Sequence, residues 1–406
     1  MSGAMGGARE GRTARWHSSG VAWKALIAGV AGLLLCMVGV AVDPTRAFAA
    51  YLFAYVTVLT MVLGALILVM ISHVTAARWF TVLRKLTLAV TASLPALAVL
   101  VLPVLFGVQR LYPWAHAASL SGELRRLALH RQAWLNVPFF VARAIIYVVV
   151  VAACGEMLRR WAARENHVSR GADVVMVLQQ QRRASAIGLV VVGLTLTMVA
   201  FDWLMPLDTE WDSTVYGVYV FAGGFVSALG VIALLAYIAA RSGSALDGSV
   251  SDEHFGALGK LMLTFVIFWA YIAFSQFLII WIGDIPADSS WYLVRGSGSW
   301  GALGVIVVIG QFAIPFILLL SRALKRQPRT LAAIGAWLVV MHVLDVYWLV
   351  LPAFSSSGMR LSWMDLSALL MVGGFVIASA ARRVRGHVAV PVNDPYFAQA
   401  VHYVEP

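Results

Sequence analysis

Two ionisable side chains, His342 and Asp345, interrupt an apolar run that extends from Leu331 to Leu351. Side chains three residues apart lie on the same face of a helix. A histidine titrates close to neutral pH, and a neighbouring carboxylate can orient it and share its proton. The pair is therefore a candidate site of proton transfer. A purely structural hydrogen-bonded pair is the alternative that the spacing leaves open.

Other polar side chains lie within or at the ends of further apolar runs, where an ionisable group is costly and is a functional candidate. They are Arg143, Gln276, Asp202, His73 and Glu156, with Gln311 near the middle of its run. Asp345 lies roughly 10 Å from the nearer end of its helix at the usual rise per residue. Arg143, Gln276 and Asp202 are predicted in the same half of the membrane, with His73 and Glu156 near the opposite end. In the structural alternative Arg143 pairs with a carboxylate or with backbone carbonyls, and His73, Glu156 and Asp202 mark helix ends.

The chain offers few ligands for a metal or a haem. It has two cysteines, Cys36 and Cys154, both in apolar runs, and no Cys-x-x-Cys-His sequence. Covalent haem c or an iron–sulfur cluster on this chain alone is therefore not expected. A haem b would need two histidines at one depth on facing helices, whereas His73 and His342 are predicted at different depths. We expect no metal site and no cofactor held by this chain alone.

The elements that must position these residues are membrane helices. Hydrophobic residues make up 61% of the chain and charged residues 12%, which is outside the range of soluble domains. Ten apolar runs are each long enough to cross a bilayer as a helix. They are Val21–Val42, Ala50–Ala77, Leu86–Val108, Val137–Leu158, Ala184–Leu204, Val215–Ala239, Ala257–Gly283, Ser299–Ser321, Leu331–Leu351 and Met364–Ala381. We predict an all-α integral membrane protein with ten transmembrane helices.

The distribution of positive charge predicts the orientation of these helices. Of the 30 Lys and Arg residues, 22 lie on the side that holds the N-terminus, seven lie on the other side, and Arg143 lies within a helix. Cytoplasmic loops of membrane proteins carry this excess of Lys and Arg. Both termini are therefore predicted to be cytoplasmic. The formal charge of +11 is explained by this orientation rather than by nucleic-acid binding.

The two ends of the chain are predicted to lie outside the membrane domain. Residues 1–20 are rich in Gly, Ser and Arg and are expected to form a disordered cytoplasmic tail. The membrane domain is expected over 21–383, and 384–406 is expected to be a cytoplasmic extension. The first apolar run, with Ala47-Phe48-Ala49 after it, could be a signal peptide. Its length favours a retained helix.

Three segments resemble one family of membrane proteins. They read FWAYIAFSQFLIIWIGDIP at Phe268–Pro286, FDWLMPLDTEWDSTVYGVYVFAGGFVSAL at Phe201–Leu229, and PVLFGVQRLYPWAH at Pro103–His116. The family is the membrane subunits of bacterial alternative complex III, a quinol:cytochrome c oxidoreductase, which are anchors of the polysulfide-reductase and nitrite-reductase type. The chain length and the third segment resemble the smaller of the two membrane paralogues in that complex.

The resemblance implies an arrangement, a location and a set of partners. Helices 2–5 and 6–9 would form two four-helix bundles, with helices 1 and 10 at the periphery, in the bacterial inner membrane. The partners would be the larger paralogous membrane subunit, a periplasmic iron–sulfur subunit, multihaem cytochrome c subunits and lipids, but no nucleic acid. Haem c and iron–sulfur clusters would belong to those partners, which would dock on the aromatic and acidic loops opposite the termini.

In this interpretation the chain carries no redox centre, and Asp345, His342, Arg143 and Gln276 line a pathway for protons or for a quinol (menaquinol or ubiquinol). Two alternatives stay open. The chain could be the membrane anchor of a molybdopterin reductase complex. It could also be a free-standing secondary transporter, because ten helices with buried polar groups fit that class as well.

Overall fold

The computed structural model describes residues 16, 18–165, 172–241 and 246–404, and all regular elements in these ranges are helical. Ten helical segments among them are long and apolar enough to cross a membrane, as the sequence predicts. Six of these segments are single α-helices: α1 (Ser19–Val42), α2 (Pro44–Val74), α8 (Val137–Glu165), α10 (Tyr216–Ala239), α11 (Asp252–Gly283) and α17 (Trp363–Val384). The other four contain a break or a short extra turn. They are α3–α5 (Thr81–Thr91, Leu94–Leu100, Leu102–Phe106), α9 (Ala172–Val199) with η3 (Ala200–Leu204), α13, η5 and α14 (Gly298–Val308, Ile309–Ala313, Ile314–Leu320), and α16 (Pro328–Val350) with η6 (Leu351–Ala353).

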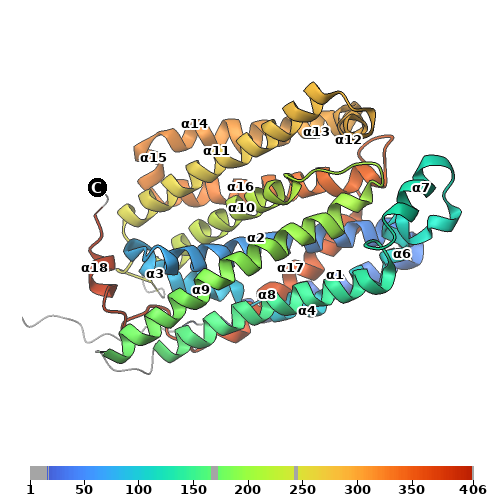
Figure 1. Ribbon diagram of the computed structural model, residues 1–406. Helices are drawn as coiled ribbons and strands as arrows, with labels where there is room; N and C mark the ends of the chain where they lie inside the picture. The colour runs from blue at the N-terminus through green and yellow to red at the C-terminus, as the bar shows by residue number, and fades with distance from the viewer. Residues whose placement is uncertain (1–15, 17, 166–171, 242–245, 405–406) are drawn as a thin grey trace, which may run out of the picture.

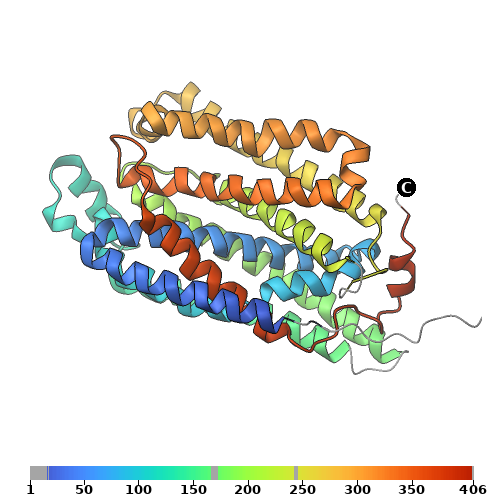
Figure 2. The same cartoon turned by 180° about the vertical axis from the view of Figure 1, so that it is seen from behind.

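The segments form two adjacent bundles of four, as expected (Figure 1). The first bundle contains α2, α3–α5, α8 and α9, and the second contains α10, α11, α13–α14 and α16. Helices α2 and α10 pack against each other and join the two bundles. Figure 2 shows α1 and α17 lying side by side along the first bundle, where α17 packs on α2. These two helices are the predicted peripheral pair.

Close backbone contacts join the two bundles at the centre. A Cβ added to Gly224 of α10 would lie 2.7 Å from the Thr60 carbonyl oxygen of α2, and one added to Gly64 would lie 2.7 Å from the Gly224 carbonyl oxygen. Small residues let the backbones of membrane helices approach closely. This packing matters because the hydrophobic effect does not drive helices together in lipid. The result is that α2 is buried along most of its length.

Several helix limits differ from the apolar runs because the caps are polar. Helix α2 begins at Pro44 rather than Ala50, since the Asp43 carboxylate accepts a hydrogen bond from the Arg46 backbone N–H at 3.0 Å. Helix α11 begins at Asp252 rather than Ala257, and Ser251 and His254 form its capping box. A hydropathy pattern follows the hydrocarbon region, whereas a helix continues into the interface until a cap ends it.

The two faces of the bundle carry different secondary elements. We call the face that holds Trp16 and the segment after α17 the terminal face, because the Trp16 N–H donates to the His387 carbonyl oxygen at 3.1 Å. The opposite face, called the far face, holds α7 (Gly122–His130) and α12 (Pro286–Gly296). Disorder is predicted for residues 1–20, of which the structure describes residues 16 and 18–20. The rest of this prediction lies outside the described part of the chain.

Candidate functional site

His342 and Asp345 lie where the two bundles meet. Both side chains are on the face of α16 that packs against α2 and α10, and each residue is 1% exposed. The Nε2 atom of His342 is 2.9 Å from the hydroxyl oxygen of Thr60 on α2. The Tyr219 hydroxyl of α10 donates to Oδ1 of Asp345 at 2.6 Å. We call Thr60, Tyr219, His342 and Asp345 the central cluster.

A glycine makes room for the central cluster. A Cβ added to Gly223 would lie 3.1 Å from Oδ2 of Asp345 and 3.2 Å from Nδ1 of His342. Gly223 follows Tyr219 by four residues, so the two share one face of α10. The helix therefore presents a hydroxyl donor and, one turn later, a space for the imidazole and the carboxyl group.

The electrostatic character of the central cluster is unusual for a buried site. Among the described residues, Asp345 takes part in none of the ion pairs. The Nδ1 atom of His342 is buried, and no described residue forms a hydrogen bond with it. Burying a carboxylate away from any cation is costly, and such groups within membrane bundles mark pathways for protons, ions or substrates. The arrangement can accept and release a proton in the interior of the bundle.

Arg143 and Asp202, by contrast, form a closed ion pair near the far face. The Nε atom of Arg143 lies 2.7 Å from Oδ2 of Asp202, and its Nη2 atom donates to Oδ1 at 3.1 Å. Tyr147 and the Trp134 indole also donate to this carboxylate, at 2.7 and 2.9 Å. The guanidinium stacks 4.2 Å from the centre of the Trp134 ring. Asp202 lies in the π-helical turn η3, which aims its carboxylate at α8. This pairing is the one that the structural alternative describes.

The remaining predicted residues lie in separate places. The Nδ1 atom of His73 is 2.8 Å from the Ser185 hydroxyl, and Glu156 accepts hydrogen bonds from Arg159, Arg160 and Arg383 at the terminal face. Gln276 donates to the Tyr292 hydroxyl at 3.2 Å near the far face. Both polar side-chain atoms of Gln311, in the π-helical turn η5, are buried and have no partner within the described part of the chain.

The positions of the two membrane histidines confirm that they lie at different depths. His342 contacts α2 at Thr60, and His73 lies on α2 thirteen residues further along. Thirteen residues of α-helix span roughly 20 Å. The two imidazoles therefore do not face each other across one haem. No group of three or more His, Cys, Asp or Glu side chains suited to a metal ion lies within the described ranges.

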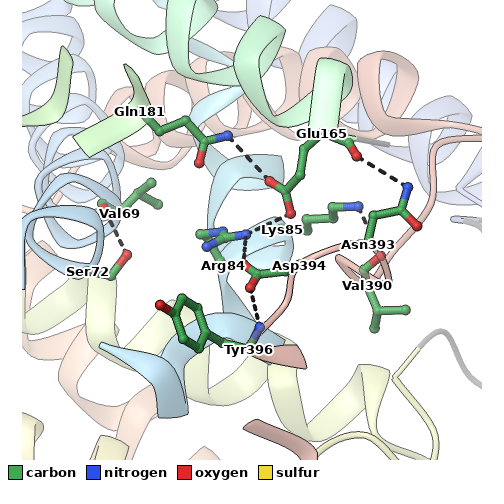
Figure 3. Close-up of polar contacts among 10 residues, drawn as sticks. All are labelled: Val69, Ser72, Arg84, Lys85, Glu165, Gln181, Val390, Asn393, Asp394 and Tyr396. Carbon is green, nitrogen blue, oxygen red and sulfur yellow. Dashed lines mark hydrogen bonds and ion pairs between the residues drawn. The ribbon is translucent and has the colours of Figure 1, made fainter. Parts of the chain in front are cut away.

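Sequence reasoning missed an ion cluster at the terminal face. Arg84 of α3 donates through Nη2 to Glu165 at 2.9 Å and to Asp394 at 2.7 Å (Figure 3). Gln181 donates to the same Glu165 carboxylate at 3.4 Å, and Lys85 donates to the Val390 carbonyl oxygen at 2.9 Å. We call Arg84, Glu165 and Asp394 the terminal ion cluster. It fastens the segment after α17 to the ends of α3 and α8.

The pattern of charge gave no signal for this cluster. Arg84 precedes an apolar run, and in the sequence it is one of many cationic residues that orient the helices. Glu165 and Asp394 lie in polar segments that hydropathy assigns to water. Only the fold places both carboxylates, each side chain 1% exposed, against one guanidinium.

Arg295 on the far face is a second buried cation that the sequence did not single out. It is 3% exposed, donates to the carbonyl oxygens of Trp291 and Leu349, and lies 3.7 Å from the centre of the Trp291 ring. Burial lowers the pKa of the Arg295 guanidinium to about 10, so it stays charged at neutral pH. Trp291 in turn stacks on Trp211 at 4.5 Å. Arg295 therefore holds α12 against α16 and the aromatic residues of the far face.

No protein-family model and no curated protein matches the chain.

Proposed function

We propose that this protein is a membrane subunit, without a redox centre of its own, of a bacterial quinol-oxidising electron-transfer complex of the alternative complex III type. The three segments around Phe268–Pro286, Phe201–Leu229 and Pro103–His116 support the proposal by their resemblance to that family. In this proposal the terminal face is cytoplasmic, and the far face meets the periplasmic subunits that hold haem c and iron–sulfur clusters. The larger paralogous subunit would lie beside this chain in the inner membrane.

The observation that carries the functional part of the proposal is the central cluster. Oxidation of a quinol releases two protons together with two electrons, so a quinol-oxidising complex needs groups that take protons within the membrane. Asp345 is a buried carboxyl group that pairs with no cation in the described ranges, and His342 lies one helical turn away. Atoms of both side chains lie within 3.2 Å of the position that a Cβ on Gly223 would occupy. This close packing favours proton transfer over the binding of a quinone ring at this point.

The far face has features that suit a docking role. Helix α12 and the end of α11 expose large apolar side chains there, among them Trp281 at 67% and Leu293 at 70%. The loop between η4 (Met205–Leu207) and α10, whose Trp211 stacks on Trp291 of α12 at 4.5 Å, adds Asp208, Glu210 and Asp212 to this face. Aromatic and apolar anchors surrounded by charged residues are typical of protein interfaces.

The subunit assignment is tested by gentle extraction of a tagged chain from its native membrane. We expect copurification of multihaem cytochrome c, visible in the reduced-minus-oxidised spectrum, and of a paralogous membrane chain, detected by mass spectrometry. A colourless chain that purifies alone would contradict the proposal and favour a transporter. A molybdopterin enzyme as the partner would favour the reductase-anchor alternative.

The role of the central cluster is tested by Asp345→Asn. Asparagine keeps the shape of the side chain and a hydrogen-bond acceptor for Tyr219, but it cannot carry a proton. We expect quinol oxidation by the assembled complex to fall by about 100-fold, because proton transfer by a positioned group typically contributes that much. Asp252→Asn, the same change at an exposed residue of α11, is the control and should leave turnover unchanged. Wild-type turnover and proton release in Asp345→Asn would remove Asp345 from the pathway.

A further inference from the structure

A small pocket at the terminal face is lined by cations. It lies between α3, α8, α17 and the segment that follows α17, and its volume is about 60 Å³. Its polar lining comes from Lys85, Arg159, Arg383 and His387, and Trp16 lies at its edge. Backbone hydrogen bonds hold this edge in place, since the Trp16 N–H donates to the His387 carbonyl oxygen and the Gly386 N–H donates to the Trp16 carbonyl oxygen, both at 3.1 Å.

The described carboxylates near the pocket are fewer than the cations, since Glu156, Glu165 and Asp394 are set against Arg84, Lys85, Arg159, Arg160 and Arg383. Glu156 is shared by three arginines: Arg159 donates to it at 2.7 Å, Arg160 at 3.0 Å and Arg383 at 2.5 Å. Two other carboxylates near Lys85 belong to the terminal ion cluster, where both bind Arg84. The Nε atom of Arg383 is buried and has no hydrogen-bond partner among the residues that the structure describes. The pocket therefore has an excess of positive charge and an unused donor.

The other walls of the pocket are apolar, and its position is at the ends of membrane helices. Leu88, Ala89, Ala162, Ala163, Val384 and Val388 form these walls. Helix α17 ends at Val384 and α8 ends at Glu165, so we expect the pocket at the level where hydrocarbon gives way to lipid headgroups. A ligand that fits both parts has an anionic head and an apolar body.

We propose that this pocket binds the phosphate group of an anionic phospholipid. Arginine guanidinium groups bind phosphate oxygens through paired, charge-assisted hydrogen bonds. Basic pockets between membrane helices on the cytoplasmic side are the sites where anionic lipid headgroups bind. Inorganic phosphate shares the head chemistry but has nothing to place against Leu88 and Val388. This inference shares with the proposed function only the cytoplasmic orientation of the terminal face, and otherwise it uses the pocket and its charge.

The proposal is tested with the chain as it is extracted, together with any subunits that accompany it. Delipidated protein is incubated with phosphatidylglycerol, with phosphatidylcholine of the same acyl chains, or with inorganic phosphate. Retained lipid is counted by native mass spectrometry, and thermal stabilisation is measured in parallel. We expect phosphatidylglycerol to be retained and stabilising, phosphatidylcholine to be retained more weakly, and inorganic phosphate at equal concentration to have no effect.

Two variants locate the binding to this pocket. Arg159→Gln and Arg383→Gln should each weaken retention of phosphatidylglycerol about fivefold, and the double variant about 25-fold, by the usual contribution of one cation at a lipid surface. Arg322→Gln, an exposed arginine of α15 (Arg322–Arg326) on the same face, is the control with the same change of charge and should retain the lipid as the wild type does. Melting curves without lipid show that each variant is folded.

Several results would overturn the lipid proposal. Equal retention of phosphatidylcholine and phosphatidylglycerol would show that charge does not select the ligand. Stabilisation by inorganic phosphate alone would identify a site for the free ion. Undiminished retention in the double variant would place the lipid elsewhere. If the glutamine variants fail to fold, the comparison of the three ligands on the wild-type protein still decides the matter.

Discussion

Replacing Arg84 with methionine is expected to destabilise the protein by about 3–5 kcal/mol, the usual cost of removing one partner from a buried ion pair. The variant would leave the Glu165 and Asp394 carboxylates together, each side chain 1% exposed, with their shared guanidinium gone. Methionine keeps most of the volume of the arginine stem, so loss of packing contributes little. We expect the segment after α17 to detach first, because Asp394 is one of its main attachments to the bundle (Figure 3).

The loss is measured as the free energy of unfolding in mixed micelles, and the detachment as faster proteolysis of 386–404. Arg126→Met is the matched control, because the Arg126–Glu123 pair is exposed and such pairs contribute about 0–1 kcal/mol. The triple variant with Glu165→Gln and Asp394→Asn should recover part of the stability, since it removes the uncompensated charge as well. Unchanged stability in Arg84→Met would show that the terminal ion cluster does not hold the fold together.

Replacing Arg143 with methionine is expected to have a similarly large effect, again about 3–5 kcal/mol. Asp202 would keep its hydrogen bonds from Tyr147 and Trp134 but would lose its counter-charge within the membrane domain. The stacking of the guanidinium on Trp134 would be lost too, and the loop before α8 would lose an anchor. Unfolding in mixed micelles and the fluorescence of the far-face tryptophans report these two changes.

A double-mutant cycle separates a structural pair from a functional one. If the pair is structural, the double variant Arg143→Met with Asp202→Asn should lose less free energy of unfolding than the sum of the two single variants. The double variant removes both charges, so neither charge is left buried without its partner. Arg143→Lys keeps the charge but not the bidentate contact with Asp202, so its free energy of unfolding should lie between those of the wild type and Arg143→Met. Normal stability with lost quinol oxidation in Arg143→Met would assign the residue to the pathway instead.

The carboxylates that pair with Arg84 and Arg143 differ from Asp345 in how their buried charge is compensated. Asp202, Glu165 and Asp394 each face a guanidinium at 2.7–2.9 Å, so they are compensated and belong to the fold. Asp345 has a phenol donor and no such cation in the described part of the chain. This difference is the physical reason that the proposed proton transfer is assigned to Asp345 and His342 rather than to Arg143 and Asp202.

The class of the protein and its membrane helices follow from hydropathy along the chain. Ten runs of about twenty apolar residues can satisfy their backbone groups in a membrane only as helices, so hydropathy alone predicts all ten. The three-residue spacing of His342 and Asp345 likewise places both side chains on one face of their helix. These features are local, and a local pattern is enough to reveal them.

The contacts between polar groups, by contrast, depend on how the helices pack in three dimensions. Arg143 and Asp202 are 59 residues apart and Arg84 and Asp394 are 310 apart, so their pairing depends on how the helices pack. The same packing gave His342 a hydroxyl partner on α2 and gave Asp345 one on α10. It also closed the cationic pocket, whose lining comes from three helices, Trp16 and the segment just after α17. Hydropathy predicts how deep in the membrane a residue lies. Its partner on another helix depends on how both helices are rotated and packed, which a single run of residues does not contain.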